Sequence, residues 1–164
     1  MNRRKMIATA ITTGLAMPLA TIALADEADT QSEKSLETAM AFMGAMGKGD
    51  MQAMGSLMAD DMIWYNEGDK DLPWIGTWKG KETIFGFLKT FSENIQVLKW
   101  DNEDVFASGD TVAVFGRMNL KTSVSERETG EFTFAVRAKV KEEQLVSWTF
   151  LEDTFAVSNA FHGK

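Results

Sequence analysis

The spacing of apolar residues divides the sequence into a helical first half and a strand-rich second half. Two amphipathic helices are predicted first, one over 32–47 and a second, short one capped by Asp50. Their apolar positions recur at steps of three and four residues: Leu36, Ala39, Met40, Met43 and Met46 in the first helix, and Met51, Met54, Leu57 and Met58 in the second.

The pattern then changes from helical spacing to alternation. A short strand over 62–65 and a loop over 66–79, rich in Gly and Asp, precede a third helix predicted over 81–94. From residue 95 on, apolar and polar residues alternate, which predicts four long strands: 95–108, 111–123, 130–141 and 144–152. A last short helix is expected over 154–161. This order predicts an α+β domain, in which a curved, mostly antiparallel sheet wraps around three N-terminal helices as a cone.

Residues 1–25 have the composition of an export signal. Three basic residues at 3–5 precede an uncharged apolar run, and Ala23-Leu24-Ala25 has the small-residue pattern of a cleavage site. The many Ala and Thr residues of the run favour a cleaved signal over a membrane anchor. We therefore expect an exported protein, periplasmic or secreted, with no membrane attachment after cleavage. A flexible lead-in is expected over 26–34 and one domain over 35–161.

Charge and composition exclude several kinds of function. Without the predicted signal, 14 of the 17 basic residues remain against 24 acidic ones, and this net charge of −10 repels nucleic acid and anionic membranes. The absence of cysteine and the single histidine, His162, argue against a thiol nucleophile, a Ser-His-Asp triad and a multi-histidine metal site. We expect no cofactor, no metal site and no nucleic-acid partner.

Four segments of the sequence form a recognisable series. The most specific is LPWIGTWKGKE at 72–82; the others are GDMQA with LMADD at 49–61, GDTV at 109–112, and the last strand, which closes on Glu152-Asp153-Thr154. With these segments the sequence resembles, over about 35–161, the SnoaL-like polyketide cyclase family. That family is part of the nuclear transport factor two-like superfamily, which includes the ketosteroid isomerases.

The resemblance implies a cone-shaped α+β barrel with a pocket between helices and sheet. Members of the family are commonly dimeric, so a homodimer is expected. Enzymatic members carry out proton transfer, aldol cyclisation or dehydration on small, mainly hydrophobic molecules, whereas other members use the same pocket for binding alone. Because one fold serves both, the fold does not choose between an enzyme and a binding protein.

Asp153 is the first candidate catalytic residue, because it matches the family's aspartate after the last strand. In an apolar pocket its pKa would rise, which would make it an acid or base near neutral pH. The alternative is that Asp153 caps the terminal helix. Tyr65 and Asn66 are further candidates as hydrogen-bond donors to a substrate oxygen. Two departures argue against catalysis: Asn66 stands where many relatives have aspartate, and Val136 where relatives often have histidine.

Aromatic side chains and one arginine are the candidate ligand contacts. Arg117 is predicted either to bind a substrate carboxylate or to pair with Asp153, or to lie on an exposed strand face or dimer surface. The aromatic candidates suit a flat apolar ligand, although such residues are more often core: Trp64, Trp74, Trp78, Phe91, Phe134, Trp148 and Phe150.

The sequence thus supports functions of different classes. The first is an exported isomerase-, cyclase- or dehydratase-like enzyme that transfers protons through Asp153, and the second is a small-molecule-binding protein without turnover. A third is Cu(I) handling by the thioethers of Met40, Met43, Met46, Met51 and Met54, whose spacing equally fits a buried helical face.

Overall fold

The computed structural model describes the backbone of residues 19–164 and the side chains from residue 29 on. Most of the predicted export signal, residues 1–18, lies outside the described residues. The helices are α1 (Leu19–Lys48), α2 (Met51–Leu57), α3 (Lys81–Asn94) and α4 (Thr154–Phe161). The strands are β1 (Met58–Asn66), β2 (Gly76–Lys79), β3 (Ile95–Ser108), β4 (Thr111–Thr122), β5 (Glu128–Lys141) and β6 (Gln144–Leu151).

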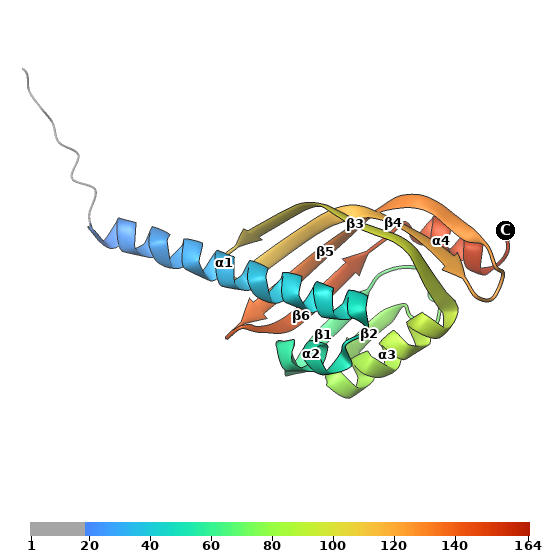
Figure 1. Ribbon diagram of the computed structural model, residues 1–164, viewed down its shortest axis with the longest axis horizontal. Coiled ribbons are helices and arrows are strands. Elements are labelled where there is room, and N and C mark those ends of the chain that lie inside the picture. The colour runs from blue at the N-terminus through green and yellow to red at the C-terminus, as the bar shows by residue number, and fades with distance from the viewer. Residues whose placement is uncertain (1–18) are drawn as a thin grey trace, which may run out of the picture.

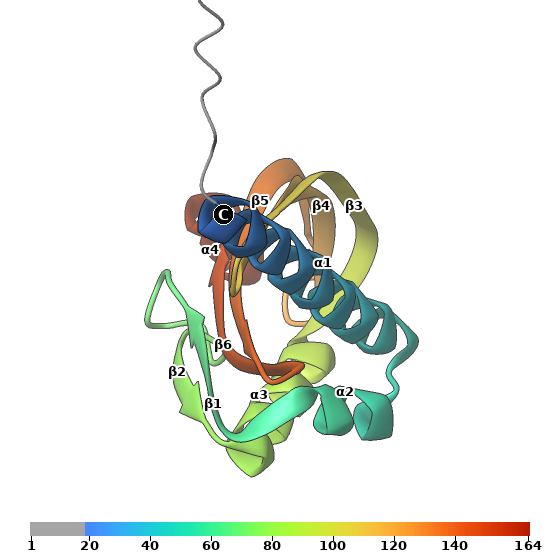
Figure 2. The ribbon, with the colours of Figure 1, turned by 90° about the vertical axis from the view of Figure 1, so that its left-hand side faces the viewer.

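The six strands form one curved sheet in the order β2-β1-β6-β5-β4-β3. β1 and β6 run parallel, and every other neighbouring pair is antiparallel. Figure 1 shows α1 lying along the concave side of this sheet, and Figure 2 shows the strands arching around that helix. The predicted α+β class and the curved, mostly antiparallel sheet are confirmed.

Three elements differ from the prediction. α1 begins at Leu19 instead of residue 32, so the segment expected as a flexible lead-in is helical. β1 begins at Met58 instead of residue 62. Met58, Met62 and Trp64 are buried at alternating positions of the strand, but the four-residue step from Met58 to Met62 also fits a helix, so the sequence pattern did not mark this boundary. The predicted loop contains β2, which pairs with β1 through Trp78 opposite Trp64. Among the described residues, no helix is both long and apolar enough to cross a membrane.

The core forms where α1 meets the concave face of the sheet. Phe42 of α1 is fully buried, and its ring lies 5.3 Å from that of Trp148 on β6 and 6.1 Å from that of Trp64 on β1. The hydroxyl of Ser35 donates a hydrogen bond of 2.8 Å to the carbonyl of Gly109, which ties α1 to the β3–β4 turn. These contacts fix α1 to the sheet at two places along the helix, at Ser35 and at Phe42.

The bend of the sheet depends on irregular pairing between β3 and β4. Register shifts interrupt this pair between Val97 and Lys99 and again between Asn102 and Asp104. Such bulges bend and twist a strand. Gly116 of β4 lies opposite the second bulge, where a Cβ would meet the backbone oxygen of Asp101 at 2.0 Å and the ring of Phe134 at 2.7 Å. The bend therefore requires a residue without a side chain at this position.

We expect Gly116→Ala to destabilise the fold. The added methyl group has no room, and overpacking of this kind costs roughly 1–3 kcal/mol or more of the free energy of unfolding. The measurement is urea unfolding followed by circular dichroism. Gly86→Ala on α3 is the matched control, since its Cβ meets nothing within 4 Å, and it should stabilise the helix by about 1 kcal/mol. Equal unfolding midpoints for Gly116→Ala and wild type would contradict this account of the bend.

Candidate functional site

A cavity of about 1010 Å³ lies between the helices and the concave face of the sheet. α1, α2 and α3 supply one side of its wall, and β1, β3 and β6 supply the other. This volume is at the upper end of the range for pockets that hold drug-sized ligands, about 300–1,000 Å³. Most of its lining is apolar, so the few polar side chains that reach it determine its chemistry.

Aromatic rings form the sheet side of the cavity. The rings of Trp64 and Trp148 lie 5.3 Å apart, and Phe150 stacks on Trp100 at 5.8 Å. Phe134 lies behind this layer, packed on Trp100 at 4.4 Å and on Phe150 at 5.9 Å. The aromatic layer supports the cavity wall and gives it an apolar surface.

Asn66 is a buried polar residue at the end of β1. Its Oδ1 accepts a hydrogen bond of 2.7 Å from the indole N–H of Trp64, and its Nδ2 donates one of 2.8 Å to the backbone carbonyl of Trp74. Asn66 lies opposite Phe150 in the parallel β1–β6 pair, two residues before Glu152. The two hydrogen bonds fix the orientation of the amide beside the end of β6.

Glu152 brings a carboxyl group into this apolar site. It follows β6, and alternation from Trp148 and Phe150 directs its side chain to the concave face. Burial raises the pKa of Glu152 from 4.5 to about 7. The nearby indole N–H of Trp74 opposes this rise, and the negative charge of Asp153 adds to it. A carboxyl group with this pKa exchanges protons near neutral pH.

The indole of Trp74 lies beside the buried carboxyl group of Glu152. Its indole Nε1 and the Oε2 atom of Glu152 are both buried, and neither makes a well-formed hydrogen bond within the described part of the chain. The indole N–H is nevertheless close enough to lower the pKa of the carboxyl group. The indole ring itself is fixed by edge-on contacts with Phe91 at 5.7 Å and Phe161 at 5.4 Å. Oε2 is thus directed into the protein beside a donor with no other partner.

The structure places Asp153 outside the cavity. Its exposed side chain accepts a hydrogen bond of 3.0 Å from the backbone N–H of Ala156 and caps α4. The capping alternative therefore describes its observed contact.

Of the other predicted site residues, some line the cavity and the rest lie elsewhere in the fold. Six line the cavity: Trp64, Asn66, Trp74, Phe91, Trp148 and Phe150. Tyr65 and Arg117 point to the convex face, where the Arg117 Nε lies 3.3 Å from a Glu103 oxygen. Trp78 stacks on Phe87 at 5.4 Å, behind the wall. Val136 is buried in the core, 3% exposed.

The SnoaL-like domain model matches residues 39–148 of this sequence, most of the chain. The chain belongs to the SnoaL-like family. None of the curated proteins matches the sequence significantly.

Solved structures show the same fold at low sequence identity. An NTF2-like protein from Burkholderia xenovorans has a TM-score of 0.73 and 23% identity, with 79% of this chain and 97% of that chain covered. TerC, co-crystallised with polyporic acid, has a TM-score of 0.68 and 19% identity, with 79% and 98% covered. An LEH-like epoxide hydrolase from M. tuberculosis has a TM-score of 0.62 and 14% identity, with 80% and 92% covered.

In this SnoaL-like domain the five methionines considered as Cu(I) ligands line one cavity. Met40, Met43 and Met46 come from α1, and Met51 and Met54 from α2. Met43 and Met54 are buried, whereas Met51 is 42% exposed. They form the wall opposite the aromatic layer. Because methionine is flexible and polarisable, this wall can adapt to the shape of a ligand.

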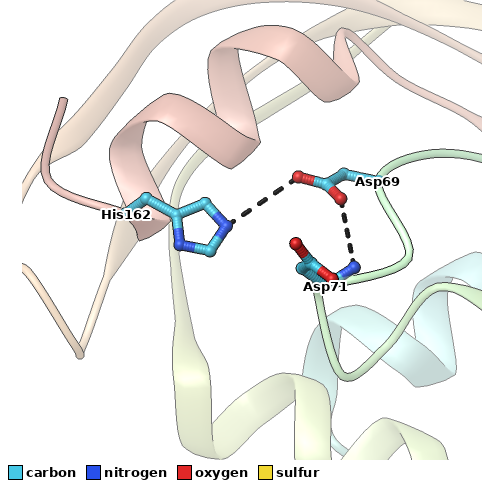
Figure 3. Close-up of side chains that lie close together, drawn as sticks. All are labelled: Asp69, Asp71 and His162. Carbon is cyan, nitrogen blue, oxygen red and sulfur yellow. Dashed lines mark hydrogen bonds and ion pairs between the residues drawn. The ribbon is translucent and has the colours of Figure 1, made fainter.

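Asp69, Asp71 and His162 form a small cluster away from the cavity (Figure 3), and their donor atoms lie within 4.8 Å of one another. Asp69 accepts hydrogen bonds from the hydroxyl of Ser158 and the backbone N–H of Asp71, and the hydroxyl bond is the main reason why the pKa of Asp69 is lowered. The His162 Nε2 lies 3.8 Å from the same carboxylate. Both Asp69 oxygens are thus engaged in joining the 66–79 loop to α4, which is a structural role.

Wild type is expected to lose stability as the pH rises, because the buried Glu152 carboxyl group ionises. Glu152→Gln should not show this loss. The pKa of the Glu152 carboxyl is about 7 in the folded protein against 4.5 when unperturbed, so the unfolded chain releases this proton first. The free energy of unfolding of wild type, relative to Glu152→Gln, should be highest below pH 4.5 and fall by about 3 kcal/mol as the pH rises through about 7.

Urea unfolding at a series of pH values measures this difference. Asp153→Asn is the matched control, because its side chain is exposed and lies next in the sequence. It should keep most of the wild-type fall, because the charge of Asp153 is the smallest cause of the shift. A difference between wild type and Glu152→Gln that does not change with pH would show that Glu152 is not buried as described.

Proposed function

We propose that this SnoaL-like protein is exported and transfers protons on a small hydrophobic carbonyl compound, with Glu152 as the general acid and base. The observation that carries the proposal is a carboxyl group of pKa about 7 at the wall of a large apolar cavity. Perturbed carboxyl groups in clefts are typical of functional sites. In the core of a purely structural protein, a carboxyl group with an unpartnered oxygen only destabilises the fold.

The pKa of Glu152 suits a reversible proton transfer. At neutral pH both forms of the carboxyl group are populated, so the carboxylate can remove a proton from carbon next to a carbonyl and the resulting acid can return it to another atom of the same molecule. The apolar wall excludes water, which strengthens electrostatic interactions within the site. Asn66, held at the same end of the cavity by its bond to the Trp74 carbonyl, has a second amide N–H for a substrate oxygen as negative charge develops there.

Two of the structural relatives favour small-molecule chemistry in this kind of pocket. One is named as an epoxide hydrolase and another was crystallised with polyporic acid. Their identity to this chain is below 25%, so they support the use of the fold for small organic molecules and leave the substrate open.

The second candidate function is ligand binding without turnover. Asn66 and Val136 replace acid–base groups that many relatives carry, so Glu152 would act without a second titratable partner on the sheet. Among the residues that line the cavity, Lys89 is the other titratable one, and it lies at the exposed side, 3.8 Å from Glu93. This arrangement favours either a reaction that uses Glu152 as its single acid and base or ligand binding without a reaction.

Deuterium exchange distinguishes the two functions. Wild type should speed the incorporation of deuterium from D₂O into the carbons beside the carbonyl of 2-tetralone, with a rate that rises with pH to a plateau above about 7. Glu152→Gln should lower the enzyme-dependent rate by roughly 100-fold or more, whereas Asp153→Asn should leave it unchanged.

Binding of 2-tetralone, followed by tryptophan fluorescence, is measured in parallel. Binding by both wild type and Glu152→Gln with no exchange above buffer in either would favour the binding protein. Exchange of equal rate in Glu152→Gln and wild type would remove Glu152 from the mechanism.

We also propose a homodimer that forms through the convex face of the sheet. Large apolar side chains are exposed there on the neighbouring strands β1 and β6 and, across β5, on β4 and β3: Ile63 at 41%, Tyr65 at 36%, Phe106 at 59%, Phe115 at 44% and Leu151 at 43%. Phe106 and Phe115 pack edge to face at 6.5 Å. Exposed apolar side chains that gather on one face are typical of an interaction site.

Light scattering after size exclusion should give twice the chain mass for wild type. Phe115→Glu should give a monomer, because it places a charge within the apolar patch. Phe155→Glu is the matched control, since Phe155 is 77% exposed on α4, and it should remain dimeric. A wild-type monomer, or a dimeric Phe115→Glu variant, would contradict this interface.

A further inference from the structure

The exposed residues of the cavity wall locate its entrance. On the α1–α2 side, the exposed lining residues are Gly44, Gly47, Gly49 and Met51. On the facing side they are Lys89 and Ser92 of α3 with Val97 and Asn102 of β3. In contrast, the end at Asn66 and Trp74 is buried. The cavity therefore opens between the C-terminal part of α1 with α2 and the corner where α3 continues into β3, elements that lie together in Figure 2.

Two glycines of α1 lie along this opening. Gly44 and Gly47 are inside the helix, where glycine is among the least favourable residues. A Cβ at either position would meet no atom within 4 Å, so no neighbour requires the absence of a side chain. Both residues line the cavity, and their missing side chains leave its rim open.

The remainder of the rim is apolar and adaptable. Met40 and Met46 lie on the same stretch of α1, and Met51 is 42% exposed at the start of α2. Val97, 44% exposed, faces them from β3. Flexible thioether side chains can move aside for ligands of different outline, whereas the helix backbone at the glycines sets a fixed limit.

Glu152 lines the same cavity, so this opening leads to the buried carboxyl group on which the proposed function rests. We propose that hydrophobic ligands enter between α1–α2 and the α3–β3 corner, and that Gly44 and Gly47 set the largest ring system that can pass. This inference rests on the proposed small-molecule function and adds the residues that select ligand size. The cavity volume of about 1010 Å³ favours a multi-ring ligand over a single ring.

The test adds a large side chain at the rim. Gly44→Phe should weaken binding of benzanthrone, a planar four-ring ketone, by roughly tenfold or more, the scale of a single misfit in an apolar pocket. Binding of the two-ring 2-tetralone should change by no more than about twofold. Titrations followed by tryptophan fluorescence give both dissociation constants, and stopped flow gives the association rates.

Gly86→Phe is the matched control. Gly86 is also exposed inside a helix with no atom within 4 Å of a Cβ, but it does not line the cavity. It should bind both ketones as wild type does. Gly47→Phe provides a second rim variant if thermal melting shows that Gly44→Phe is unfolded.

The outcomes separate this inference from the proposed function. If wild type binds both ketones and the rim variants bind benzanthrone as tightly and as fast as wild type, the entrance is wrong while the proposed function stands. Equal losses for both ketones would also contradict size selection at Gly44. If wild type binds neither ketone, the pocket function fails and the entrance fails with it. If wild type shows size selection but no deuterium exchange above buffer, the entrance stands and the catalytic role of Glu152 fails.

Discussion

The packing of Phe42 against Trp148 and Trp64 is the contact on which the structure depends. It holds α1 against the concave side of a sheet that curves around the helix, and this curvature depends on the β3 bulges and on the absence of a side chain at Gly116. With no cysteine in the sequence, this apolar contact has no disulfide to support it. It fills one part of the concave face completely and leaves the cavity beside it. The core and the cavity are thus two parts of the same concave surface. The aromatic side chains fill the space between α1 and the sheet in the core and leave it open in the cavity.

The cavity in turn sets the electrostatics of Glu152. In water this carboxyl group would be ionised at neutral pH, and removal from solvent is the main cause that raises its pKa to about 7. The Trp74 indole limits the rise, and that indole is positioned by Phe91, Phe161 and the hydrogen bond from Asn66 to its backbone. The 66–79 loop therefore contributes to the site through Trp74, although most of the loop lies at the surface. The Asp69 contacts to α4 hold the same loop in place.

The sequence predicted the fold well because its signals are local and repeated. Alternation identified β3 and β6 to within one residue, and helical spacing identified α3 and α4 fully. Met58 was assigned to a helix because its four-residue spacing from Met54 fits both a helix and a strand, and only the pairing of β1 with β6 distinguishes them. β2 was missed because its four residues, which begin with Gly76 and are followed by Gly80, carry too short a pattern. The beginning of α1 lies before the amphipathic segment. There, no difference between an apolar and a polar helix face marks where the helix begins.

The structure arranges the candidate site differently from the sequence prediction, because the buried carboxyl group belongs to Glu152, and Asp153, Tyr65 and Arg117 are exposed. A strand predicted over 144–152 already places Trp148, Phe150 and Glu152 on one face, so alternation alone indicates an inward carboxyl group. The motif instead directed attention to Asp153, which the helix start takes as its cap. The wall aromatics were found because they belong to periodic elements, while Arg117 and Tyr65 occupy the opposite positions of the same strands. Relatives below 25% identity show the fold alone, so the proposed reaction depends on side chains such as Glu152 and Asn66, which the period of the strands and not the family pattern places at the cavity.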